Sequence, residues 1–143
     1  MQLLYVWIEE YKNIKKQGFN FGSEFLFKYK NEVLTIEDNP NYIEGFFGEH
    51  VSNVTAIVGK NGSGKSTVIE FIKQNFPKGE VNGITDCAII VANSGKTASK
   101  TYENNGTIYI FYHESLKFNL QKKIKILILK PLDIVMMIIC RFY

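Results

Sequence analysis

The residues best suited to chemistry form one glycine-rich stretch, Gly59-Lys60-Asn61-Gly62-Ser63-Gly64-Lys65-Ser66-Thr67. Their spacing fits the pattern G-x-x-x-x-G-K-[ST], which forms phosphate-binding loops. The glycines let backbone N–H groups approach phosphate oxygens closely, because no Cβ stands in the way. We expect Lys65 to reach the β- and γ-phosphates, Ser66 to bind Mg²⁺, and Thr67 to lie near the α-phosphate. The stretch therefore predicts binding of a nucleoside triphosphate.

A loop of this kind has to be positioned by a strand before it and a helix after it. Residues 54–58, Val-Thr-Ala-Ile-Val, predict a buried strand. Residues 66–76 predict an amphipathic helix that ends before Pro77, because proline cannot continue a helix. The first turn of that helix offers unpaired N–H groups and the positive end of the helix dipole to an anion. The apolar residues at helical spacing are Val68, Ile69, Phe71, Ile72 and Phe76.

The rest of the chain has mainly the patterns of β-strands. Before the loop, strands are expected at residues 3–9, 19–21, 25–30 and 33–36, with a turn at Lys30-Asn31. In the third of these, aromatic residues alternate with other side chains and predict one aromatic face. After the helix, residues 87–91 predict a short strand, and residues 101–103 and 107–112 predict the two arms of a hairpin with its turn at Asn104-Asn105-Gly106. Ser94-Gly95-Lys96-Thr97 imitates the end of the phosphate loop, but Ile90 stands where its first glycine should be, so we expect a polar turn there.

The particular residues of the loop resemble the G-x-N-G-x-G-K-S-T form of ABC-type ATPases. These include the SMC-, RecN- and RecF-like heads and the related bacterial AAA-family ATPase proteins. Residues 8–14, Ile-Glu-Glu-Tyr-Lys-Asn-Ile, resemble the opening strand of those heads, where a basic residue approaches the nucleotide. The alternative for that residue, Lys12, is a solvated turn lysine. The resemblance covers roughly residues 1–115 and implies ATP and Mg²⁺ as ligands. It implies a site formed by Lys12, Asn13, Gly59, Asn61, Gly62, Ser63, Gly64, Lys65, Ser66 and Thr67, with Ser66 as the metal ligand.

The same resemblance implies an α/β fold of the ABC-ATPase type. Its order would be an N-terminal β-meander, then the strand–P-loop–helix unit, then further antiparallel strands, and we expect the fold to be incomplete. A β-rich segment precedes the loop here, whereas a kinase or GTPase of the Rossmann-like kind usually begins with its P-loop strand. The order of elements therefore favours the ABC type.

Several motifs with which that family hydrolyses ATP are missing from the sequence. The chain contains no Asp-Glu pair after an apolar strand, no Ser-Gly-Gly signature core and no candidate for the switch histidine. The apolar run Ile108–Tyr112 is followed by His113-Glu114, and Glu114 is either a displaced catalytic base or an ordinary strand end. We therefore expect ATP binding with little or no hydrolysis by this chain alone. In the family, hydrolysis takes place across a head-to-head dimer, so the resemblance also implies a homodimer.

Two other classes of function stay open. A small P-loop kinase or GTPase would need an Asp-bearing second strand or an Asn-Lys-x-Asp box, and neither is visible. A non-enzymatic module would use the nucleotide to order an interaction surface for a partner, such as a nuclease or a DNA-repair protein. Turnover measured with and without such a partner would separate this module from an ATPase.

Length and composition limit the number of domains and the compartment in which we expect the protein. With 143 residues and 45% hydrophobic residues, the chain fits one globular domain. The two cysteines, Cys87 and Cys140, form no disulfide framework and suggest a reducing, cytoplasmic compartment. We expect no signal peptide, because the N-terminus lacks a basic region and a small-residue cleavage site. We expect no membrane span, because no uncharged apolar run is long enough. His50 and His113 lack partners at metal-ligand spacing and predict ordinary loop or strand-end residues.

The charge of +3 divides unevenly between two segments, residues 1–116 and 117–143. The first carries 11 basic and 13 acidic residues, and the second carries six basic residues and one acidic residue. The body thus has a charge of −2 and lacks a basic footprint for nucleic acid, whereas the tail has a charge of +5. Three interpretations of the tail stay open: a strand before Pro131 with a short apolar helix or strand after it, a membrane-surface segment, or out-of-frame translation after a frameshift.

Overall fold

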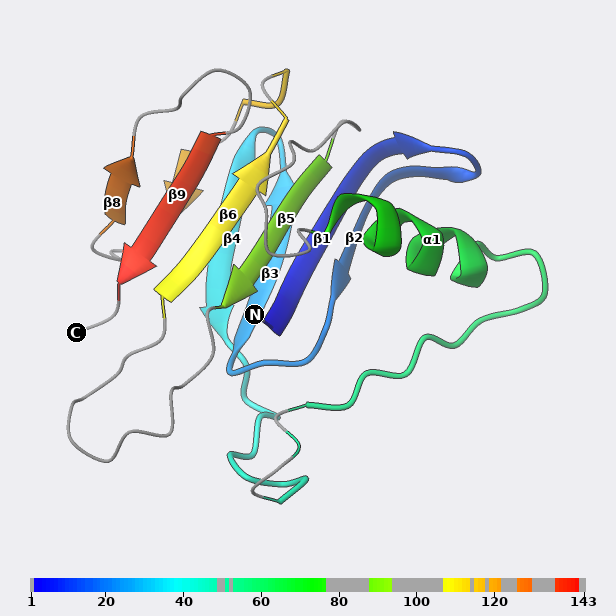
Figure 1. Cartoon of the computed structure of the whole chain (residues 1–143), viewed down its shortest axis with the longest axis horizontal. Coiled ribbons are helices and arrows are strands. Elements are labelled where there is room, and N and C mark those ends of the chain that lie inside the picture. Colours follow the sequence, from blue (N-terminus) through cyan, green and yellow to red (C-terminus); the bar gives the residue numbers. More distant parts are fainter. Residues whose placement is uncertain are drawn as a thin grey trace.

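The computed structural model describes residues 2–48, 51, 53–76, 88–93, 107–113, 115–117, 119–121, 126–129 and 136–141. These residues form one helix and nine strands (Figure 1). The strands before the helix are β1 (Gln2–Tyr11), β2 (Ile14–Asn20), β3 (Phe25–Lys30) and β4 (Val33–Asp38). The helix is α1 (Lys65–Asn75), and it is followed by β5 (Ala88–Asn93), β6 (Thr107–Tyr112), β7 (Asn119–Gln121), β8 (Ile126–Leu129) and β9 (Met136–Arg141).

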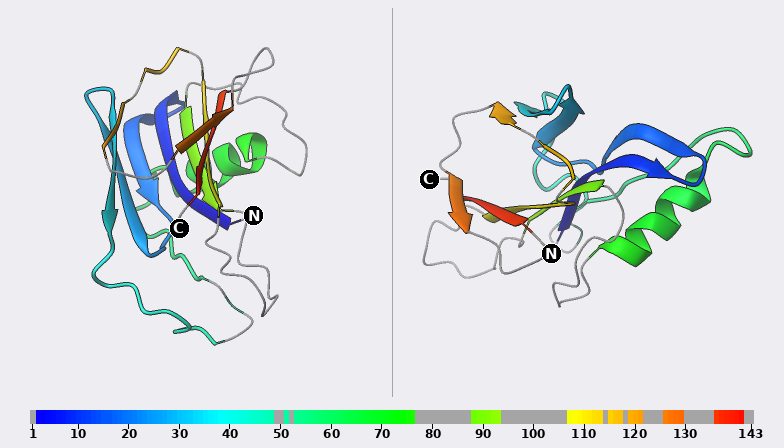
Figure 2. Two further views of the ribbon diagram at one scale, coloured as in Figure 1. Left: turned by 90° about the vertical axis from the view of Figure 1, so that its left-hand side faces the viewer. Right: turned by 90° about the horizontal axis from the view of Figure 1, so that it is seen from above.

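The strands belong to two sheets. The large sheet has the order β2-β1-β5-β6-β9-β8, and each neighbouring pair in it is antiparallel. The small sheet has the order β3-β4-β7, in which β7 is parallel to β4. Figure 2 shows three layers, with α1 on one face of the large sheet and the β3–β4 hairpin on the other.

The large sheet buries both of its faces, as the strand β5 illustrates. Ile89 and Val91 point toward the small sheet, while Ile90 and Ala92 belong to the core under α1, and all four are fully buried. Successive side chains of a strand point to opposite faces, so a strand covered on both sides is apolar at every position. This explains why the predicted strand at residues 87–91 lacks a polar face.

The β3–β4 hairpin confirms the predicted aromatic face. Phe27 and Tyr29 are buried, whereas Lys28 and Lys30 are exposed. The turn lies at Asn31 and Glu32, one residue later than predicted, because Lys30 pairs with Val33. Both turn residues have positive φ, 52° and 60°, which suits the twist of a two-residue hairpin.

Two side chains of the large sheet hold the free edge of β3. The amide of Asn20 accepts a hydrogen bond from the N–H of Phe27 (2.8 Å) and donates one to its carbonyl oxygen (2.9 Å). The hydroxyl oxygen of Tyr5 accepts a hydrogen bond from the N–H of Tyr29 (3.2 Å), and burial raises the pKa of Tyr5 to about 12. These contacts satisfy backbone groups that a sheet edge otherwise leaves unpaired, and they fasten the small sheet to the large one.

The N-terminal hairpin is longer than predicted. β1 reaches Tyr11 and β2 begins at Ile14, so only two residues form the turn between them. After the buried Ile14, the first half of β2 is polar, and its residues pair with β1 through the backbone and through charges. The ammonium of Lys15 lies 2.6 Å from a carboxylate oxygen of Glu10, its neighbour on β1. An edge strand of this kind buries little, so its side chains carry no apolar period.

The strand predicted at residues 54–58 is absent, and this expectation is wrong for the structure described here. These residues form no strand, and 59% of Val54 and 88% of Val58 are exposed. A strand with apolar residues on both faces needs a neighbouring strand on each side, and none of the described strands pairs with this segment. Figure 1 shows it as a long trace that leads to α1. The expected strand–loop–helix unit is therefore present as loop and helix only, within mostly antiparallel sheets, and the ABC-type fold stays a prediction.

The C-terminal strands extend the large sheet. β9 pairs with β6 from Thr107↔Arg141 to Tyr112↔Met136, and β8 pairs with β9. Strands at these positions agree with the first of the three interpretations of the tail, while the frameshift hypothesis concerns the gene and stays untested. No helix among the described residues is long and apolar enough to cross a membrane. Other predictions fall outside the described residues, namely those at Ser94–Thr97, Thr101–Gly106, His50, Pro77, Cys87 and Glu114.

Candidate phosphate-binding site

The predicted helix is confirmed, and it begins at the lysine of the phosphate loop. Gly64 is its N-cap, with φ 93° and ψ 12°, and the first intrahelical bond runs from the N–H of Val68 to the carbonyl of Gly64 (2.9 Å). No side chain caps the first turn, and the first turn contains no acidic residue. The N–H groups and the positive end of the helix dipole are therefore available to an anion. At the other end, Phe76 is extended (φ −74°, ψ 124°), as a residue before proline should be.

The ammonium group of Lys65 folds back across the loop. It donates hydrogen bonds to the carbonyl oxygens of Gly59 and Lys60, each at 2.8 Å. A turn bond from the N–H of Ser63 to the carbonyl of Lys60 (3.2 Å) closes the same part of the loop. Both acceptors of the ammonium are neutral, and none of the ion pairs among the described residues includes Lys65. Among the residues that the structure describes, none therefore neutralises its positive charge.

Two glycines of the motif are explained by the geometry of the loop. Gly64 has a left-handed φ of 93°, and a Cβ there would lie 3.3 Å from Nδ2 of Asn13. A Cβ on Gly59 would lie 2.5 Å from Oγ of Ser63, which is closer than real Cβ atoms approach. The Gly64 position thus needs glycine for its backbone conformation, whereas a Cβ on Gly59 would require the Ser63 side chain to move.

An open pocket of about 500 Å³ lies in front of the helix N-terminus. Its lining residues are Asn13, Asn61, Gly62, Gly64, Lys65, Ser66 and Thr67, all of which the sequence predicted as site residues. None of these described lining residues is acidic. The pocket therefore combines a lysine, two hydroxyl groups and the start of a helix, which together suit a polyanion.

The β1–β2 turn supplies the one lining residue from outside the loop. The Nδ2 atom of Asn13 lies 3.4 Å from the carbonyl oxygen of Gly62, to which it donates. Lys12 points elsewhere: its Nζ lies 2.6 Å from each carboxylate oxygen of Glu70 on α1. The hydrogen bond to Glu70 raises the pKa of Lys12 above its usual value. The structure thus brings Asn13 to the pocket but does not place Lys12 among its lining residues.

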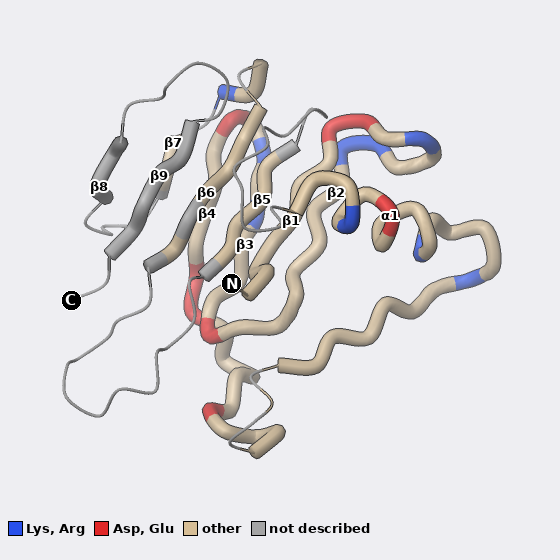
Figure 3. The backbone as a smooth tube through the Cα atoms, viewed as in Figure 1, with Lys and Arg blue, Asp and Glu red and all other residues tan. Residues whose placement is uncertain are grey.

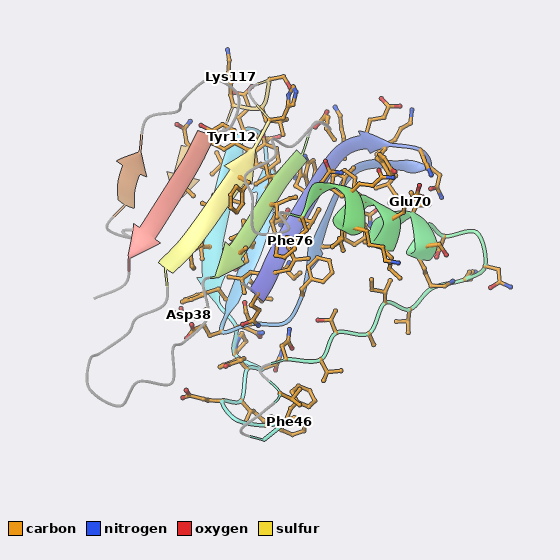
Figure 4. The ribbon with its side chains drawn as sticks, viewed as in Figure 1. Asp38, Phe46, Glu70, Phe76, Tyr112 and Lys117 are labelled. Atoms are coloured by element: carbon orange, nitrogen blue, oxygen red, sulfur yellow. The ribbon has the colours of Figure 1, made fainter. Side chains whose placement is uncertain are left out.

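The sequence did not reveal that α1 contacts this turn. Glu70 and Gln74 lie one helical turn apart, and the hydroxyl group of Tyr11 donates to Oε1 of Gln74 (2.8 Å). Figure 4 shows Glu70 on the side of α1 that faces the hairpin. The spacing of four residues was a signal that these side chains share a face, but the sequence held no sign of what that face meets.

The remaining described residues show no second cluster suited to catalysis or metal binding. His113 follows the end of β6, as expected, and its Nδ1 lies 2.7 Å from Oγ of Ser115. No group of three or more potential metal ligands occurs among the residues that the structure describes. Figure 3 shows acidic and basic residues interspersed along the described part of the backbone.

Comparisons of the chain with protein-family models, with curated proteins and with solved structures give no match. The proposal below therefore rests on the loop, on its pocket and on the resemblance of the loop residues to ABC-type ATPases.

Proposed function

We propose that this chain binds a nucleoside triphosphate with Mg²⁺ at the N-terminus of α1. The observation that carries the proposal is the position of Lys65, an ammonium that has no carboxylate partner among the described residues and lies beside an uncapped helix start. The pocket residues fit the ligand, because the described lining contains donors and hydroxyl groups but no acidic side chain that would repel phosphate.

Each residue of the pocket has a role in this proposal. Lys65 exchanges its two carbonyl acceptors for phosphate oxygens, and the first-turn N–H groups bind further oxygens. The hydroxyl group of Ser66, which is exposed at the pocket, would hold the metal. Bound Mg²⁺ would neutralise part of the phosphate charge. Thr67 lies beside it on α1 and would hydrogen-bond the phosphate nearest the nucleoside.

We further propose that the nucleotide is ATP and that this chain turns it over slowly or not at all. The choice of ATP and the assignment to an ABC-type head rest on the resemblance of the loop residues. The proposal of slow turnover is supported by the lack of a carboxylate among the described lining residues, since a water molecule needs a base or polarising group to attack phosphate.

Replacing Lys65 by alanine tests the binding site. Lys65→Ala should weaken binding of a fluorescent ATP analogue in the presence of Mg²⁺ by at least about tenfold, because a charged hydrogen-bonding group is lost. Lys73→Ala is the matched control, since it removes the same charge from the last turn of α1, away from the pocket. Equal binding by wild type and Lys65→Ala would reject the site.

A further inference from the structure

Two residues at the end of the β1–β2 hairpin are fastened to α1. The hydroxyl group of Tyr11 donates to Gln74, and its ring packs edge-on against Phe71, with ring centroids 5.1 Å apart. The next residue, Lys12, forms hydrogen bonds to both carboxylate oxygens of Glu70. Two consecutive residues at the end of the hairpin, the last of β1 and the first of the turn, thus contact one face of α1.

The residue after these two lies at the pocket. Asn13 donates to the carbonyl of Gly62, and its amide stands against the position where a Cβ of Gly64 would be. Lys12 has a φ of 52°, a backbone conformation that non-glycine residues seldom adopt. Positive φ at the first residue suits a two-residue hairpin turn, and the contacts of Tyr11 and Lys12 hold this turn against α1.

We propose that Glu70 is a positioning residue for the phosphate pocket: through Lys12 it holds the β1–β2 turn against α1 and so keeps Asn13 at the loop. This inference rests on the proposed nucleotide site. Glu70 does not line the pocket, but it determines the position of Asn13, which does. Gln74 supports the same turn through Tyr11, one helical turn further along.

The variant Glu70→Gln tests this role, because it keeps the size of the side chain and removes its charge. It should raise the Kd for a fluorescent ATP analogue with Mg²⁺ by about two- to fivefold, where fivefold is the upper limit expected for the loss of an exposed ion pair. The difference from wild type should shrink as salt is added, because salt screens exposed charges. The charge-exchanged double variant Lys12→Glu/Glu70→Lys should recover most of the affinity.

The chain offers a matched control in the same hairpin. Glu10 pairs with Lys15 at 2.6 Å, the same distance as the Lys12–Glu70 pair, but this ion pair lies within the hairpin and includes no residue of α1. Glu10→Gln should therefore leave the Kd unchanged. A merely structural role of surface ion pairs would change both variants alike and would overturn the proposal.

The role of Asn13 is tested by coupling and by a signal that needs no nucleotide. In the Asn13→Ala background, Glu70→Gln should cause no further loss of affinity; an undiminished loss would overturn the proposal. In the nucleotide-free protein, Glu70→Gln should shift the side-chain amide resonance of Asn13, whereas Glu10→Gln should not. Tighter nucleotide binding by Glu70→Gln would show that the freed Lys12 itself reaches the phosphates, and would also overturn the positioning role.

These measurements separate the two proposals. If wild type fails to bind the analogue, the proposed function fails, while the amide resonance still reports whether Glu70 positions Asn13. If wild type binds and Glu70→Gln binds equally well, the nucleotide site stands and the positioning role fails.

Discussion

The segment that ends at Val58 and the segment that follows it differ in regular structure and in burial. After Val58, residues 59–76 form the predicted loop and helix, and α1 buries Val68 and Phe71 against the large sheet. Before it, the described residues of 42–58 form no helix or strand, and Figure 4 shows Phe46 at the outer end of this segment. Seven large apolar side chains are exposed there: Tyr42, Ile43, Phe46, Phe47, Val51, Val54 and Val58.

The difference between these segments lies in where their hydrogen bonds go. A helix closes its own backbone bonds between residues four apart, so a short sequence with one apolar face can specify it. A strand satisfies its backbone only by pairing with another strand. Residues 54–58 have the composition of a buried strand, but composition does not determine whether neighbouring strands are present to pair with it.

The largest expected contrast compares one phenylalanine from each side. Phe71 is fully buried between α1 and the large sheet, so Phe71→Ala should lower the free energy of unfolding by about 3–5 kcal/mol. Phe46 is 68% exposed, so Phe46→Ala should change it by less than about 0.5 kcal/mol. Urea unfolding of both variants gives the comparison. Equal losses would mean that the segment before Val58 is buried in solution.

A smaller contrast compares two glycines with left-handed φ. Gly64 (φ 93°) lies at the loop beside Asn13, whereas a Cβ on Gly45 (φ 70°) would meet nothing within 4 Å. Each glycine-to-alanine change should cost about 1–2 kcal/mol of unfolding free energy, because alanine disfavours this conformation. Only Gly64→Ala should also weaken binding of the ATP analogue. If Gly64→Ala binds as tightly as wild type, the backbone at Gly64 is not part of the phosphate site.

The smallest change in unfolding free energy is expected at Val58, and it tests whether residues 54–58 form the predicted strand. Val58 is 88% exposed, so Val58→Lys should change the unfolding free energy by less than about 0.5 kcal/mol. Val68→Lys is the control, since it places a charge at a buried position of α1 and should destabilise the protein strongly. If Val58→Lys is as damaging as Val68→Lys, residues 54–58 form the buried strand that the sequence predicts.

Within the fold, prediction succeeded where the pattern was local and failed where it depended on a partner. The alternation from Phe25 to Tyr29 was enough to place one face of β3 in the core. The polar start of β2 gave no such signal, because an edge strand is held by backbone pairing with β1. In the same way, Lys12 could be recognised as a basic turn residue, but not as the partner of Glu70.

By itself, the sequence determined the glycine-rich loop at residues 59–64 and the helix that follows it. These elements form through interactions between residues only a few positions apart in the chain. The order of the glycines, Lys65 and the apolar residues of the helix is therefore enough to predict them. The tertiary structure alone decided that Asn13 joins the pocket, that Lys12 turns to Glu70, and that residues 54–58 pair with none of the described strands. Those outcomes depend on contacts between segments far apart in the chain, which only the folded arrangement brings together.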